Sequence, residues 1–253
     1  MSEQRHFRLI VVGDNHTDLI KKYDNNKKVK KYLVYKFADK DKLKEKQLSY
    51  MKVSLNSLDP ESPMYQMLLD QYDEYSNMDS LEFYTEITEG MIIDEETGDA
   101  YSEDNPDGRY DRIQLAGQFA LPLITKEGKE IYSCRKKDVD WPKVHLTGKE
   151  AYEFAWDSVM GNRKPVTDDE KIIYENMKNR KAYFEHYKTR ENYVMSNTAF
   201  WGYAFLSEKE GWKELEPNIN QIDWVINFYN RFIVPLGEDE LITIYECYRE
   251  AGV

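Results

Sequence analysis

The run Phe7–Val12 (FRLIVV) is the feature that most restricts how this chain can fold. A short apolar run rich in β-branched residues and bounded by turn residues is typical of a buried strand. Asn15 can cap a helix over His16–Tyr23, because its side chain accepts hydrogen bonds from unpaired backbone amides. Lys31–Phe37 alternates in polarity and predicts a second strand. The sequence therefore predicts a β-α-β opening.

The segment after this opening is expected to mix helices with hairpins. Apolar residues at helical spacing predict a lysine-rich helix over residues 39–55. A further helix is expected to begin at Pro63 with Ser62 as its cap, since the first helical position does not need an amide donor. Glycines divide residues 79–136 into short runs that we interpret as hairpins, with Glu127-Gly128 as one turn.

The C-terminal third is expected to be helical. Thr147-x-x-Glu150 and Thr167-x-x-Glu170 both have the spacing of a capping box, in which side chain and backbone satisfy each other at a helix start. Apolar residues at helical spacing predict a helix over residues 222–232 and a last helix over residues 241–248.

Together these patterns predict the α+β class. A chain of 253 residues fits one large domain or two small ones. We expect residues 1–140 to form an α+β region, with the β-α-β opening and the hairpins. Residues 141–253 are expected to form a mostly helical region, either as a second domain or within one compact unit.

Composition excludes several classes of protein. No apolar stretch approaches the roughly 20 residues that a membrane-spanning helix needs, and residues 1–7 carry no signal-peptide core. We therefore expect neither secretion nor a membrane partner. Cys134 and Cys247 do not form a CxxC pair, so no zinc site is expected.

The charge changes sign along the chain. Residues 21–52 are rich in lysine, whereas acids dominate residues 57–112. A basic and an acidic patch on one molecule suit head-to-tail contacts between copies, although the two segments could equally pair within one chain. We expect an interaction surface to include Lys21, Lys22, Lys27, Lys28, Lys30, Lys31, Glu95, Glu96, Asp99 and Asp111.

Nucleic-acid binding is an alternative use of the lysine-rich segment. Its lysines could contact phosphates, and its tyrosines could stack on the bases of a single strand. The net charge of −12 opposes this, because the whole molecule then repels a polyanion.

A second alternative is a metal-dependent phosphoesterase or nuclease. Gly13-Asp14-Asn15-His16 follows the first predicted strand, and calcineurin-like metallophosphoesterases begin a two-metal site in this way. Asp14 and His16 would then be the metal-binding pair. The further Asp, Asn and His blocks of those enzymes are missing, and the competing interpretation is a helix cap followed by a surface histidine.

The loop Glu103–Gly108 resembles half of an EF-hand, which makes Glu103, Asn105 and Asp107 candidate calcium ligands. Gln114 stands at the twelfth position, where an EF-hand has a bidentate glutamate. A solvated turn is the simpler interpretation.

The stretches Val194–Leu206 (VMSNTAFWGYAFL) and Trp224–Ile233 (WVINFYNRFI) resemble uncharacterised proteins of large tailed bacteriophages of gut bacteria, such as crAss-like phages. The resemblance covers roughly the C-terminal half of the chain and transfers no functional residue. It implies a virion component, such as a neck or tail ring protein, or a host-takeover factor, and with either a location in the host cytoplasm or in a virion. We therefore expect a structural or interaction protein that assembles with itself or other subunits, rather than an enzyme, and that uses no cofactor.

Overall fold

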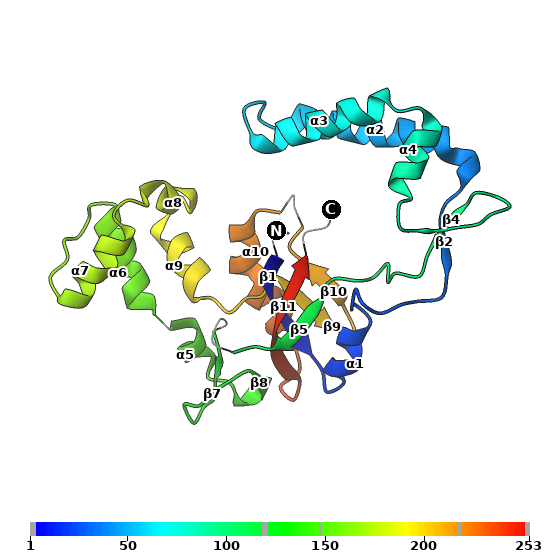
Figure 1. Ribbon diagram of the computed structural model, residues 1–253. Helices are drawn as coiled ribbons and strands as arrows, with labels where there is room; N and C mark the ends of the chain where they lie inside the picture. Colours follow the sequence, from blue (N-terminus) through cyan, green and yellow to red (C-terminus); the bar gives the residue numbers. More distant parts are fainter. Residues whose placement is uncertain (1–3, 118–120, 147, 217–218, 251–253) are drawn as a thin grey trace. The chain divides into compact units, whose positions relative to one another are not determined.

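The computed structural model describes residues 4–117, 121–146, 148–216 and 219–250, and it divides into two compact units (Figure 1). Unit 1 comprises residues 1–27 and 106–253, and unit 2 comprises residues 28–105. The boundary expected at residue 140 falls inside unit 1, because one sheet of this unit pairs strands that precede the boundary with strands that follow it.

Unit 1 is built on a six-stranded mixed sheet with the order β10-β9-β1-β11-β5, in which β8 also pairs with β11. The central pair β1 and β11 is antiparallel, whereas β9 runs parallel to β1. The six strands are β1 (Gln4–Val12), β5 (Arg112–Leu115), β8 (Ser133–Arg135), β9 (Ala204–Ser207), β10 (Gly211–Glu214) and β11 (Leu241–Glu250). A separate hairpin joins β6 (Leu123–Ile124) to β7 (Glu130–Ile131).

Successive side chains of a strand point to opposite faces of a sheet. In this sheet the side chains on both faces lie in hydrophobic cores. Ile10, Phe205 and Ile244 lie in a core that includes residues of the helix α10 (Gln221–Phe228) and the π-turn η3 (Tyr229–Ile233). Leu9 and Leu206 lie in a second core, with residues of α1 (His16–Lys21).

The other helices of unit 1 stand between β8 and β9 in the sequence. They are η2 (Lys136–Asp138), α5 (Trp141–Leu146), α6 (Lys149–Val159), α7 (Asp168–Met177), α8 (Lys181–His186) and α9 (Arg190–Thr198). Phe184 and Tyr193 are buried in an aromatic cluster of their own, with ring centroids 4.6 Å apart. Arg190 ties α9 to α6, since its Nε and Nη2 each donate to Asp157 at 3.0 Å.

Unit 2 combines a small sheet with three helices. The sheet has the order β2-β4-β3 and is antiparallel. The elements are β2 (Tyr32–Tyr35), η1 (Phe37–Asp39), α2 (Lys40–Ser57), α3 (Pro63–Asn77), α4 (Ser80–Ile87), β3 (Ile92–Ile93) and β4 (Ala100–Ser102). The Tyr84 hydroxyl donates to the backbone oxygen of Gly98 at 3.0 Å and so fixes α4 to the loop before β4.

The α+β class is confirmed, but the predicted last helix is wrong, because residues 241–250 form the strand β11. Ile242, Ile244 and Glu246 point to one face, and Thr243 and Cys247 to the other, and all of them are buried. A strand covered on both faces loses the alternation that identifies a strand. Its apolar residues then also match helical spacing. The C-terminal region is therefore less helical than expected.

The β-α-β opening is confirmed as the order of elements β1, α1 and β2, although β1 and β2 belong to different sheets and β2 pairs with β4. The hairpin prediction for residues 79–136 holds for β3–β4 and β6–β7, while a helix, α4, begins that segment. Its cap is Asp79, which forms a capping box with Glu82.

Two of the predicted helix starts are confirmed. Ser62 accepts a hydrogen bond from the Tyr65 amide at 3.1 Å, and Thr167 forms its capping box with Glu170. Asn15 stands at the cap position of α1 without a side-chain hydrogen bond to the helix. Thr147 lies outside the described residues, and the residue before α6 is Gly148.

Candidate functional site

Asp14 and His16 follow β1 directly, but their side chains bind different partners. Asp14 Oδ1 forms an ion pair with Arg135 Nη2 at 2.8 Å. His16 Nδ1 lies 2.7 Å from the Tyr245 hydroxyl oxygen. No group of three or more His, Cys, Asp and Glu side chains in the described ranges is placed to hold a metal ion. Among the residues that the structure describes, Asp14 and His16 are therefore not part of one metal-binding group.

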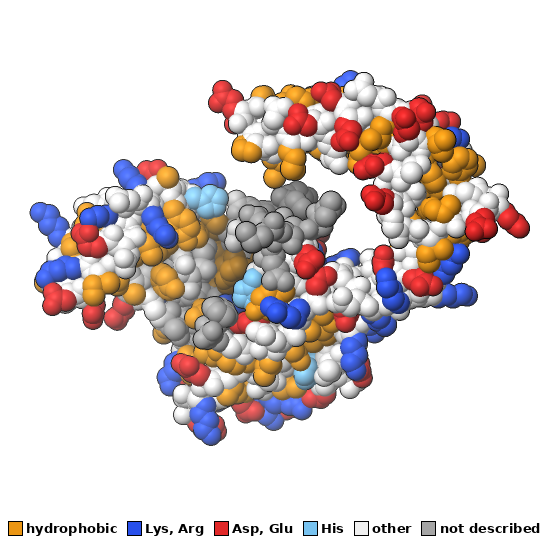
Figure 2. Space-filling model, viewed as in Figure 1, with side chains coloured by type: hydrophobic (Ala, Val, Ile, Leu, Met, Phe, Trp, Pro, Cys, Tyr) orange, Lys and Arg blue, Asp and Glu red, His pale blue; other side chains and the backbone are white. Residues whose placement is uncertain are grey.

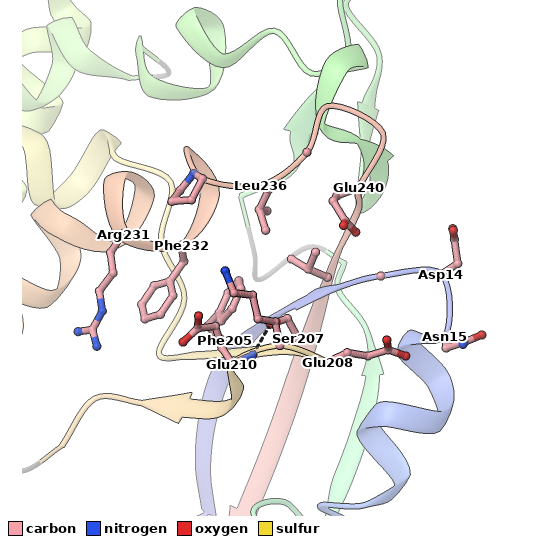
Figure 3. Close-up of a pocket in the computed structure, with 15 residues that line it drawn as sticks. Asp14, Asn15, Phe205, Ser207, Glu208, Glu210, Arg231, Phe232, Leu236 and Glu240 are labelled. Atoms are coloured by element: carbon pink, nitrogen blue, oxygen red, sulfur yellow. Dashed lines mark hydrogen bonds between the residues drawn. The ribbon is translucent and has the colours of Figure 1, made fainter.

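A cavity of about 480 Å³ lies beside Asp14, at the ends of β1 and β9 (Figure 3). These two strands are parallel, so their carboxyl ends meet at one edge of the sheet. In open sheets with parallel strands, ligands bind at this edge. Phe205, Phe232 and Leu236 supply apolar side chains to the cavity.

The charged side chains of this cavity are of both signs. Figure 3 shows Asp14 and Glu208 on one side and Arg231 on the opposite side. Arg231 is held over the ring of Phe232, with its Cζ 4.9 Å from the ring centroid. Ser207 Oγ accepts a hydrogen bond from the Glu210 amide at 3.1 Å and so stabilises the turn after β9. The cavity can hold a small polar molecule. Among the described residues, no side chain that could act as a general base forms a hydrogen bond with the Ser207 hydroxyl.

A second polar site crosses the sheet where β1 pairs with β11. Arg8 stands opposite Glu246 in the strand register, and Glu246 stands opposite Gln114 of β5. The Glu246 side chain is 2% exposed, and its carboxylate accepts from Gln114 Nε2 at 3.0 Å and from the Gly117 amide at 3.3 Å. His6 Nε2 lies 3.8 Å from the same carboxylate.

The Arg8 guanidinium carries the positive charge on the residue opposite Glu246 in the strand register. Burial lowers the pKa of Arg8, and the nearby charge of Glu246 acts in the opposite direction. Arg8 Nη1 donates to the backbone oxygen of Trp201 at 3.0 Å. Sequence reasoning missed this pair, although a signal exists. Arg8 and Glu246 each interrupt an apolar run at a position that alternation assigns to a buried face.

The predicted lysine surface is partly engaged within the chain. Lys28 Nζ forms an ion pair with Asp104 at 2.5 Å, and this hydrogen bond raises the pKa of Lys28. The Lys31 ammonium lies 4.4 Å from the ring centroid of Tyr101, and Lys21 pairs with Asp18 at 3.0 Å. The simpler alternative, in which basic and acidic segments pair within one chain, therefore accounts for part of this charge.

Two of the predicted acidic residues also have structural roles. Asp99 Oδ1 accepts from the Phe37 amide at 3.0 Å. Asp111 accepts from Asn25 Nδ2 at 2.8 Å and from the Glu250 amide at 2.6 Å.

Of the candidate calcium ligands, Glu103 and Asn105 belong to unit 2, whereas Asp107 belongs to unit 1. The Glu103 backbone oxygen accepts from the Val29 amide at 2.7 Å. The described residues do not form a metal site here either.

The helices α2 and α3 of unit 2 expose large apolar side chains. Met51 is the one residue of these two helices that is fully buried. Tyr50, Val53, Met64 and Met67 are between 59% and 67% exposed. Tyr50 and Val53 are three residues apart and so share one face of α2, and Met64 and Met67 share one face of α3 in the same way. Figure 2 shows hydrophobic side chains interspersed with charged ones on the visible face of these helices.

Comparison of the chain with protein families, with curated proteins and with solved structures finds no match. No helix in the described part of the chain combines the length and the apolar character needed to cross a membrane.

Proposed function

We propose that this chain is an interaction protein that works by assembly, and that the hairpin of α2 and α3 is its binding surface. The observation that carries the proposal is the pair of apolar stripes, Tyr50 with Val53 and Met64 with Met67, which stay exposed on helices with almost no core of their own. Exposed apolar stripes flanked by polar residues mark protein-binding surfaces. Methionine suits such a surface because it is flexible and polarizable.

The partner we propose is a second copy of the chain. Helix α2 carries five lysines and two acids, whereas α3 carries three acids and no basic residue. Both helices are fully described, and no ion pair joins α2 to α3 within one chain. In a two-fold dimer the same patch meets itself, so α2 of each copy can lie against α3 of the other. Each dimer then contains two contacts in which the lysines of α2 attract the acidic residues of α3.

The resemblance to proteins of large tailed phages suggests the setting of this assembly. A ring at the neck or tail of a virion is closed by head-to-tail contacts between copies, and the proposed two-fold contact would join such subunits in pairs. We therefore propose a virion subunit, located in the host cytoplasm before assembly.

The test is the molar mass of the purified chain in solution, measured by light scattering across a range of concentrations. Each methionine buried at the interface contributes about 1.5 kcal/mol, which is about tenfold in the dissociation constant. Replacing Met64 and Met67 with serine should therefore shift the chain strongly towards the monomer. Ile172→Ser is the matched control, because Ile172 is 60% exposed on a helix of unit 1.

Charge reversal then tests the proposed pairing of α2 with α3. Lys46→Glu with Lys52→Glu should weaken the dimer, and so should Asp70→Lys with Glu74→Lys. The variant that carries all four changes should recover association, because the attraction is restored with inverted signs. A wild-type chain that stays monomeric at all concentrations, or a serine variant that associates as the wild type does, would refute the proposal.

A further inference from the structure

The first half of β1 has an open edge at which a ligand can meet the sheet. Strand β9 pairs only with Leu9–Val11, so residues before Leu9 are paired on the β11 side alone. The segment Trp201–Tyr203 runs beside this edge. Gly202 allows the backbone to lie this close to β1, because any larger residue would place a Cβ 2.8 Å from Ile10 Cγ1 and 2.9 Å from a backbone oxygen. Trp201 and Tyr203 are therefore held on either side of a close backbone contact.

A pocket of about 310 Å³ lies at this edge, lined by His6, Arg8, Trp201, Tyr203, Gln221 and Glu246 among others. Its volume falls at the lower end of the roughly 300–1,000 Å³ range of small-molecule sites. The rings of Trp201 and Tyr203 suit a flat ligand. Gln221, the exposed first residue of α10, adds an amide that can both donate and accept.

The pocket contains the half-buried positive charge of Arg8 and the buried negative charge of Glu246, and each has capacity left for a ligand. Arg8 has five N–H donors, and one of them donates to the Trp201 backbone oxygen. Glu246 has about four acceptor positions, and the hydrogen bonds from Gln114 and Gly117 use two. A ligand that fits must therefore present acceptors to Arg8 and donors to Glu246.

We propose that this pocket binds the guanine base of a nucleoside or nucleotide. Guanine is flat and can lie against the aromatic rings. Its O6 and N7 atoms are acceptors that match the fork of an arginine. Its N1–H and N2–H groups are donors that match a carboxylate. Adenine presents an N6 amino donor in place of O6 and so would face Arg8 with the wrong group.

The charge of the protein indicates the form of the ligand. The formal net charge is −12, which repels a polyanion, and Glu246 already offsets the charge of Arg8. A phosphate chain therefore has little to gain here. We expect the base to supply most of the binding, so that guanosine and guanosine monophosphate bind about equally well.

The test is titration of the full chain with guanosine, guanosine monophosphate and adenosine monophosphate, followed by calorimetry. The guanine ligands should bind saturably and about tenfold or more tightly than the adenine ligand, as expected for one bidentate base contact. Glu246→Gln should weaken guanosine binding about tenfold, because an amide donor then faces the N–H groups of the base. Glu250→Gln, an exposed change on the same strand, is the control.

Two further measurements complete the test. Gln221→Ala alters an exposed side chain and should also weaken binding, so the proposal stays testable if Glu246→Gln does not fold. RNA pentamers of uridine with one central guanosine or adenosine distinguish the source of the base. A guanosine pentamer that binds more tightly than guanosine supports a base within a strand, and equal or weaker binding supports a free nucleoside. Absence of saturable guanosine binding, or equal binding of the two purines, would overturn the proposal.

Discussion

Replacing Gly202 with alanine tests whether the segment before β9 is pressed against β1 as described. The added Cβ would lie 2.8 Å from Ile10 Cγ1 and 2.9 Å from the backbone oxygen of Ala204, and both distances are shorter than real Cβ contacts. Ile10 is fully buried in the sheet core and has no free space to move into. The clash must therefore be relieved by a shift of the backbone.

Overpacking of this kind lowers the free energy of unfolding by about 1–3 kcal/mol. For a unit of this size, each kcal/mol lowers the melting temperature by about 2–4 °C. The expected loss for Gly202→Ala is thus about 2–12 °C. Gly117→Ala is the matched control, because a Cβ there meets no atom within 4 Å and the residue does not have a positive φ. We expect the control to change stability by less than about 0.5 kcal/mol.

Tryptophan fluorescence is the appropriate assay, because it reports on unit 1 alone. All five tryptophans of the chain lie in unit 1: Trp141, Trp156, Trp201, Trp212 and Trp224. Trp224 is a direct reporter of the change, since its Nε1 donates to the Gly202 backbone oxygen at 2.8 Å. Urea unfolding followed by emission therefore measures unit 1 without a contribution from unit 2. Equal midpoints for the Gly202 and Gly117 variants would show that the close contact with β1 does not exist.

Two predictions concern titratable groups in the cores of unit 1. Burial raises the pKa of both the Cys134 and Cys247 thiols, so neither should react with a thiol reagent in the native chain near neutral pH, and both should react in urea, as absorbance would show. Fast native reaction of Cys247 would contradict its position in the sheet core. Burial lowers the pKa of His145, and its Nε2 has no hydrogen-bond partner among the residues that the structure describes. The unfolded chain should then bind a proton that the folded chain does not, so stability should fall as the pH drops from about 6.5 towards the lower folded-state pKa. Urea midpoints for the wild type and His145→Phe would show this, because the variant should lose that part of the pH dependence.

The sequence predicted those strands and helix starts whose formation depends on neighbouring residues. FRLIVV gave the strand β1, and Ser62 with Pro63 marked the start of α3, because a strand core and a helix cap depend on adjacent residues. The pairing of β1 with β9 brings together residues almost 200 positions apart. No pattern within a window of sequence contains that information, so the sequence predicted β1, α1 and β2 but not the strands with which β1 and β2 pair.

The candidate site on the sheet was missed for a related reason. A charged residue within an apolar run is ordinarily assigned to solvent, so Arg8 and Glu246 did not stand out singly. Each becomes significant only when the register of β1 and β11 places them opposite one another. Asp14 shows the converse case, because a familiar short motif suggested metal binding as an alternative, whereas the structure shows an ion pair with Arg135.

The Arg8–Glu246 pair is poorly explained by stability alone. Removing opposite charges from water is unfavourable, and well-packed apolar residues in their place are often neutral or stabilising. Further along the same sheet face, Ile10 and Ile244 form such an apolar pair in the register. The face therefore changes from apolar to charged at the point where β9 ends its pairing and a pocket begins. A requirement to hold the sheet together gives no reason for the change at that point, whereas a ligand with donors and acceptors does.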